Sequence, residues 1–156
     1  KFVLLDNRLE KETMSSNAIG LARLYKPVTV GSTLGATTVQ NFTYFGKAWK
    51  PYSPVHICAE RDGSGNITLS WVRRSRVGGG WRDSVDVPLH ESSERYEIEV
   101  LDGESVVRTM QVTMAEASYS VSEQTIDFGS AQSSVSVRIY QISDVIGRGY
   151  PGEAVV

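Results

Sequence analysis

Apolar and polar residues alternate along several short stretches of the chain. In the clearest of them, Ile67, Leu69 and Trp71 fall on one side of an extended strand, because successive side chains of a strand point to opposite faces. An apolar run at residues 55–59 precedes this strand, and a turn at residues 61–66, rich in glycine, aspartate and asparagine, joins the two. The pattern predicts two strands joined by a tight turn, with a large aromatic side chain directed into a core.

The same alternation returns downstream at residues 95–101 and 134–142. Asp102 and Gly103 form a hairpin signal that leads into a further strand at residues 106–114. Many short strands separated by turns, with no helical pattern after residue 50, predict an all-β fold in which two sheets pack as a β-sandwich. Shorter strands are expected at 85–89, 119–121, 126–128 and 154–156. The core is expected to contain Ile67, Leu69, Trp71, Tyr96, Ile98, Val100, Val137 and Ile139.

The first fifty residues read differently. We expect strands at 2–5, 24–30 and 39–45, and a helix within residues 9–24. Two or three strands bury too little surface for an independent core, so this part is predicted to be a small β-rich region at the end of an upstream domain. Since the chain begins with Lys1 and a strand-like run follows immediately, we expect it to be a piece of a longer polypeptide.

Two prolines within residues 50–54 indicate an extended segment and mark the boundary between the parts. The predicted domains are therefore residues 1–50, the β-rich region, and residues 51–156, the sandwich. About one hundred residues is the size expected of a sandwich module.

Composition excludes several classes of function. The 156 residues carry a formal net charge of −2, which gives no global attraction to nucleic acid, and no stretch approaches the roughly 18 apolar residues of a membrane helix. The lone Cys58 cannot form an internal disulfide and, lying in an apolar run, is expected to be buried. The two histidines, His56 and His90, are far apart, and the sequence has no second cysteine to complete a metal-ligand pattern, so no metal or cofactor is predicted.

Several of these residues resemble a fibronectin type III module, an immunoglobulin-like β-sandwich. The resemblance is carried by residues 65–71, ending at Trp71, by Tyr96 with its neighbours, and by residues 135–139. In that family a tryptophan on the second strand packs the core, and Trp71 occupies the matching position.

A second resemblance covers nearly the whole chain. Residues 69–79, with 87–89, 137–143 and the upstream 20–31, are similar to the C-terminal part of the baseplate hub, or host-specificity, protein of siphophage-like tails and gene transfer agents. This implies a structural and adhesive module in the tail tip of a virion, assembled in the host cytoplasm. Its implied partners are other tail and baseplate proteins and a polysaccharide or receptor on the host cell surface. The enzyme-like barrel that some relatives carry has no counterpart in these residues, so no enzymatic activity is predicted.

A glycine-rich loop supplies the candidate binding residues. Arg74, Arg76 and Arg82 surround it, and Trp81 follows three glycines within it. The arginines could contact an oxyanion, or they could be solvated residues paired with Asp83, Glu97 or Glu99. Trp81 could stack on a sugar ring or a partner surface, or fold back over the end of the sandwich.

Two further readings compete with a tail-tip role. One is a carbohydrate-binding module attached to a larger tail or a secreted enzyme, which would need an exposed aromatic side chain such as Trp81. The other is a hydrolase that uses His90 with Glu91, Ser92 and Ser93, but residues so close in sequence rarely converge as a triad, and the sequence lacks a nucleophile-elbow pattern.

Overall fold

The computed structural model describes residues 10, 12–80 and 83–156. The chain forms two compact units, of which the first ends at Ala48 and the second runs from Trp49 to Val156.

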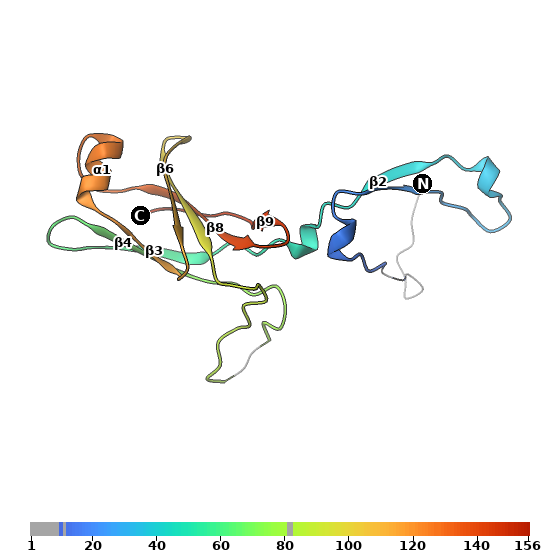
Figure 1. Cartoon of the computed structure of the whole chain (residues 1–156), viewed down its shortest axis with the longest axis horizontal. Helices are drawn as coiled ribbons and strands as arrows, with labels where there is room; N and C mark the ends of the chain where they lie inside the picture. The colour runs from blue at the N-terminus through green and yellow to red at the C-terminus, as the bar shows by residue number, and fades with distance from the viewer. Residues whose placement is uncertain (1–9, 11, 81–82) are drawn as a thin grey trace. The chain divides into compact units, whose positions relative to one another are not determined.

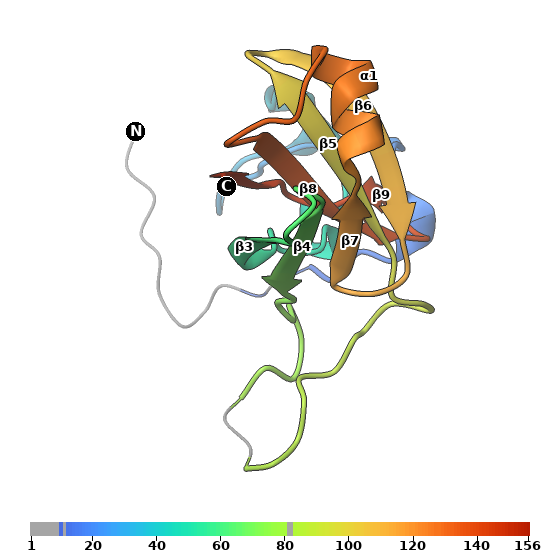
Figure 2. The same ribbon diagram turned by 90° about the vertical axis from the view of Figure 1, so that its left-hand side faces the viewer.

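The second unit consists of two antiparallel sheets that stack face to face (Figures 1 and 2). The smaller sheet has the order β3-β4-β7, and the larger has the order β10-β8-β5-β6, with the short β9 beside β8. The elements are β3 (Val55–Arg61), β4 (Ile67–Val72), β5 (Tyr96–Asp102), β6 (Ser105–Val112), β7 (Glu116–Tyr119), α1 (Val121–Phe128), β8 (Ser136–Ser143), β9 (Gly147–Arg148) and β10 (Gly152–Val155).

Both sheets contribute alternate residues to one core. Burial alternates strictly along β4 and β8, as expected for strands with one face on a core. The rings of Trp71 and Tyr96 meet edge to face between the sheets, with their centroids 5.1 Å apart. All eight predicted core residues are buried, and Tyr119 and Val135 join them. A three-stranded sheet facing a four-stranded one in this order is the fibronectin type III-like sandwich, so the predicted fold class is confirmed.

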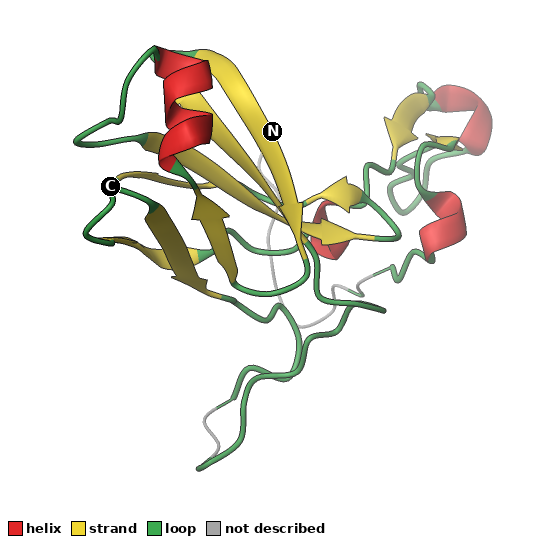
Figure 3. Ribbon diagram, turned by 60° about the vertical axis from the view of Figure 1, so that its left-hand side comes forward, coloured by secondary structure: helices red, strands yellow, loops and turns green. Residues whose placement is uncertain are grey.

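The second unit also contains a helix that the sequence pattern did not indicate (Figure 3). Strands were predicted at 119–121 and 126–128, but β7 ends at Tyr119 and α1 covers Val121–Phe128. Ser120 and Glu123 form a capping box, in which each side chain accepts a hydrogen bond from the other residue's backbone N–H. Gly129, in the left-handed region at φ 83°, ends the helix. Among the described residues, no helix is long and apolar enough to cross a membrane.

Two other predictions about this unit are wrong. Residues 85–89 form no strand but belong to the long connection between β4 and β5. Cys58 is exposed, because Ile57 and Ala59 direct their side chains toward the core and Cys58 therefore points outward. A bulge between Val55 and Cys58 interrupts the pairing of β3 with β4 at the same place.

The segment that enters the sandwich contacts its last strand closely. The backbone N–H of Tyr150 donates to the carbonyl of Pro51 over 2.9 Å. A Cβ on Gly149 would lie 2.7 Å from that carbonyl oxygen, and a Cβ on Gly152 would collide with the carbonyl of Pro54. Glycine is therefore required where these two backbones meet.

The first unit is built around a two-stranded antiparallel sheet. Its elements, in chain order, are the 3₁₀ turn η1 (Ser16–Ala18), β1 (Ala22–Tyr25), η2 (Leu34–Ala36) and β2 (Gln40–Thr43), and η3 (Lys47–Trp49) follows at its end. The helix predicted within residues 9–24 is wrong for the described residues, where the short η1 stands instead. The strand predicted at 39–45 exists as the shorter β2, whereas the one predicted at 24–30 is misplaced, because β1 ends at Tyr25 and residues 26–30 form no strand. The strand predicted at 2–5 lies outside the described residues.

Candidate interaction sites

The connection between β4 and β5 spans residues 73–95, and loops of this length in compact domains usually carry function. Figure 3 shows it leaving the sandwich as an extended excursion. Ion pairs hold its base together. Arg73 Nη2 lies 2.7 Å from Asp86 Oδ2 and 3.0 Å from the carbonyl of Val87. Arg76 Nη2 lies 2.9 Å from Glu91 Oε1, and both side chains are at least nine-tenths buried. The loop base is thus held by one buried ion pair, Arg76–Glu91, and by Arg73, whose partner Asp86 is largely exposed.

Two of the four predicted binding residues lie over aromatic rings at this base. The Arg74 guanidinium lies 5.0 Å from the ring centre of Tyr52, and that of Arg76 lies 5.5 Å from the ring centre of Trp49. Trp81 and Arg82 lie outside the described residues. The role assigned to these four residues stays a prediction.

The expected ion-pair partners of the loop arginines were partly wrong. Among the described residues, Glu97 and Glu99 pair not with Arg74 or Arg76 but with Arg148 and Arg138 on the outer face of β5. Arg148 Nη1 is 2.8 Å from Glu99 Oε1, and Arg138 Nε is 2.7 Å from Glu153 Oε1, a hydrogen bond that raises the pKa of Arg138. The outer face of the larger sheet therefore carries mutually satisfied charges.

A second polar cluster ties α1 to β6. Arg108 Nε donates to Asp127 Oδ2 over 2.6 Å, and the Tyr119 hydroxyl donates to the same oxygen over 2.8 Å. The hydrogen bond from Arg108 is the main reason why the pKa of Asp127 is lowered, while burial raises the pKa of Tyr119. This cluster fastens the helix and leaves no free charge for a ligand. Among the described residues, no group of three histidine, cysteine, aspartate or glutamate side chains could hold a metal ion.

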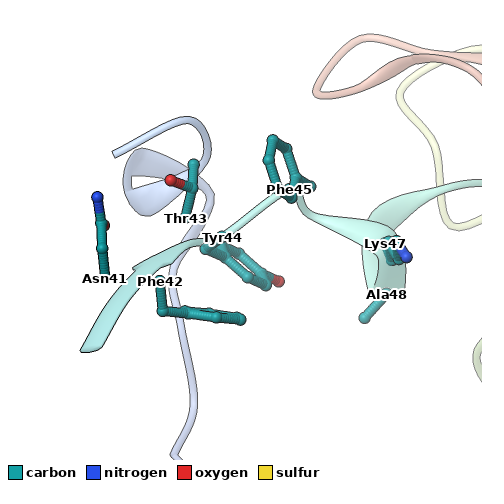
Figure 4. A pocket seen from close by; sticks show the side chains of 7 residues that line it. All are labelled: Asn41, Phe42, Thr43, Tyr44, Phe45, Lys47 and Ala48. Atoms are coloured by element: carbon teal, nitrogen blue, oxygen red, sulfur yellow. The ribbon is translucent and has the colours of Figure 1, made fainter. Parts of the chain in front are cut away.

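The first unit presents a different kind of surface, with apolar side chains in solvent. Phe42, exposed at 51%, and Phe45, exposed at 66%, belong to a cavity of about 700 Å³ lined by β2 and the residues that follow it (Figure 4). In Figure 4 the rings of Phe42 and Tyr44 lie on one side of the strand, whereas Thr43 and Phe45 lie on the other. Strand periodicity therefore divides this unit into two faces.

Phe42 and Tyr44 also line a second cavity, of about 430 Å³, together with Tyr25, Gln40, Glu12 and Met14. Tyr25 reaches this face because it pairs with Gln40, and Phe42 pairs with Arg23 on the same face. From the sequence, these aromatic residues were expected only as parts of strands. One signal for an exposed aromatic face was available in the sequence. Phe42 and Tyr44 are two residues apart in a predicted strand, so they share a face, and no second sheet was predicted to cover that face.

No protein-family model and no curated protein matches the chain. Among solved structures, domains d3–d4 of the rat CD45 extracellular region match all of this chain and 74% of theirs, with 14% identity and a TM-score of 0.48. A protein described as a myokine has 15% identity over 68% of this chain and 95% of its own, with a TM-score of 0.43. The FN5 domain of Drosophila Lar has 15% identity over 68% of this chain and 94% of its own, with a TM-score of 0.38. The fold assignment rests on the strand order and core of the sandwich rather than on these similarities.

Proposed function

We propose that the chain is a structural and adhesive module of the tail tip of a phage or a phage-like particle such as a gene transfer agent. Its partners in this role are other tail and baseplate proteins, and a receptor or polysaccharide on the host surface. A fibronectin type III-like sandwich supports the structural part of the proposal, since such modules usually act as spacers or adhesion units. The resemblance of residues 69–79 to tail-tip hub proteins supports the setting.

The observation that carries the assembly role is the exposure of the first unit. Of the eighteen large hydrophobic side chains that are exposed among the described residues, eight lie between residues 21 and 45. Leu24, on the face opposite Phe42, is 73% exposed, and Phe45 is 66% exposed. So many exposed apolar side chains on a small unit indicate a protein contact, and a two-stranded sheet needs further packing to be stable. A neighbouring tail protein would supply both.

The proposal is tested in the particle whose tail contains this chain. Leu24→Ser combined with Phe45→Ser removes two apolar side chains from one face of the hairpin while leaving its strand pairing intact. We expect tails that assemble poorly or lack the tip when seen by electron microscopy, and adsorption to host cells that falls in proportion. The matched control is Ile126→Ser with Met114→Ser, two similarly exposed residues of the second unit. Normal assembly and adsorption of the Leu24/Phe45 variant would overturn the assembly role.

A carbohydrate-binding module remains the alternative for the sandwich end, and it depends on Trp81. The rings of Trp49 and Tyr52 at the loop base each have an arginine over one face, which leaves less of them for a sugar. Binding of the purified chain to extracted surface polysaccharide, lost in Trp81→Ala and unaffected by Leu24→Ser with Phe45→Ser, would favour this alternative.

A further inference from the structure

Aromatic rings of the two units differ in how they meet positive charge. In the second unit five rings have a lysine or arginine of the same unit over them, at 4.7 to 5.7 Å from the ring centre. They belong to Trp49, Tyr52, Tyr119, Tyr140 and Tyr150. Within the part of the chain that the structure describes, no cation lies over Tyr25, Phe42 or Tyr44 of the first unit. The π faces of these three rings are therefore open to a cation from outside the chain.

These rings form a corner rather than a flat surface. Tyr25 and Phe42 stand at 76° to each other with centroids 6.2 Å apart, and Tyr44 follows Phe42 on the same face of the hairpin. Met14, Gln40 and the carboxylate of Glu12 complete the lining of the 430 Å³ cavity. We call Tyr25, Phe42, Tyr44, Met14 and Glu12 the aromatic corner. Rings at right angles can each present a negative face to one compact cation, which a flat stack cannot do.

The charged groups at the corner favour a positive guest. Glu12 Oε2 accepts a hydrogen bond from the Tyr25 hydroxyl over 3.4 Å, so the carboxylate is held beside the ring. Arg23 Nη1 lies 3.6 Å from Glu12 Oε1, but both side chains are about half exposed, and ion pairs of this kind are weak. Arg23 stands beside the carboxylate and not over a ring. The ring faces thus stay available although Glu12 has one cationic neighbour.

We propose that the aromatic corner binds a quaternary ammonium group. A lysine ammonium carries three N–H donors, and the only charged acceptor among the described residues that line the cavity is the Glu12 carboxylate, which already serves Tyr25 and Arg23. A trimethylated nitrogen has no N–H to satisfy, and its methyl groups contact ring faces and the Met14 side chain. Quaternary ammonium groups are accordingly the guests that aromatic corners recognise best. This inference goes beyond the proposed function and does not depend on it.

Three probes of similar size test the chemistry on the full chain. Choline carries the trimethylammonium group, 3,3-dimethylbutan-1-ol has the same shape without charge, and ethanolamine has the charge without the methyl groups. Ring-proton NMR signals of Tyr25 and Phe42 report binding directly. We expect saturable shifts with choline and an affinity about tenfold higher than for either of the other two probes.

Variants locate the site. Phe42→Ala should reduce choline affinity about tenfold, and the nearly isosteric Glu12→Gln should reduce it about threefold. Phe45→Ala, on the opposite face of the hairpin, should leave choline binding unchanged. Glu12 is exposed, so Glu12→Gln should leave the hairpin folded. This variant therefore still tests the site if Phe42→Ala disturbs the hairpin.

Three outcomes would overturn the proposal. Equal binding of the neutral alcohol would mean that the corner is only an apolar groove. Equal binding of ethanolamine would mean that charge alone is recognised. Absence of saturable shifts at about 100 mM choline would mean that no site of useful affinity exists.

Discussion

Two pairs of aromatic rings in this molecule meet at almost the same interplanar angle but have opposite surroundings. Trp71 and Tyr96 meet at 77° inside the sandwich, where both are buried. Tyr25 and Phe42 meet at 76° on the two-stranded sheet of the first unit, where Phe42 is half exposed. The first pair bridges two sheets, whereas the second lies along a two-stranded sheet that no other described strand of the first unit covers. Edge-to-face packing therefore does not tell whether a ring pair serves stability or recognition; the presence of an opposing sheet does.

The comparison extends to the charges. In the sandwich, several rings and carboxylates are matched by arginines and lysines of the same unit, as Arg148 shows by contacting Glu97, Glu99 and the ring of Tyr140. In the first unit the rings lack such cover within the described residues. A region that satisfies its own side chains acts as a scaffold, and a region that leaves them unsatisfied is prepared for a partner.

The largest expected difference between the two ring pairs is in stability, when one ring of each pair is replaced by alanine. Trp71→Ala should lower the free energy of unfolding by about 3–5 kcal/mol, because it removes buried surface and leaves a cavity. Phe42→Ala should change it by less than about 0.5 kcal/mol, since its ring is half in solvent. Urea unfolding followed by far-ultraviolet circular dichroism measures both. Similar losses in the two variants would show that ring geometry, rather than burial, carries the energy.

The close backbone contact at the sandwich entry should give the next largest effect. Gly152→Ala places a methyl group against the carbonyl of Pro54 and should cost about 1–3 kcal/mol in urea unfolding, because two backbones must separate. Gly63→Ala is the matched control, since a Cβ there meets nothing within 4 Å and should have almost no effect. A Gly152→Ala variant as stable as the control would mean that the entry segment moves aside without loss.

The ion pair that fastens α1 should make the stability of the sandwich depend on pH. Asp127 has a lowered pKa in the folded protein, chiefly because of its hydrogen bond from Arg108, so its stabilising contribution is complete above the unfolded pKa of about 3.9. That contribution is lost as the pH falls through the lower, folded-state pKa. Asp127→Asn should therefore be about 1–2 kcal/mol less stable than the parent chain at pH 7, with a smaller difference at low pH. A difference that does not change with pH would contradict this assignment.

The smallest effect on stability is expected from the exposed aliphatic face of the first unit. Leu24→Ser should change the free energy of unfolding by less than about 0.5 kcal/mol, because the side chain is 73% exposed. Val137→Ser, at a buried position of β8, should lower stability by several times as much in the same assay. A large loss from Leu24→Ser would show that the first unit buries this residue and is itself a folded scaffold.

The sandwich core was predictable because its signal is local. Period-two alternation places Ile67, Leu69 and Trp71 on one face whatever lies opposite, and the structure buries all three. Helix α1 was missed although its capping box, Ser120 and Glu123, can be read in the sequence. The short apolar runs within the helix resembled strands. The helix is also held by contacts that depend on the tertiary fold, because the fully buried Gln124 side chain donates to the carbonyls of Gly65 and Tyr119.

The candidate sites were less predictable because they depend on contacts between residues that are far apart in the sequence. Arg74 and Arg76 were singled out from the sequence, but their aromatic neighbours Tyr52 and Trp49 precede them by more than twenty residues, across the β3–β4 hairpin. The aromatic corner depends on the register that places Tyr25 beside Gln40, and nothing in the local pattern fixes that register.

The contact between the entry segment and the last strand also determines how the sandwich would bear a mechanical load. Pro54 lies against Gly152, and the Arg61 side chain donates to the carbonyl of Val156, so β3 and β10 run side by side in the same direction. A force applied between Pro54 and Val156 therefore acts along the strands. It loads the hydrogen bonds from β3 to β4 and from β10 to β8 in shear, all together, instead of opening them one after another. A module pulled in this direction should resist unfolding by force far better than its modest size suggests.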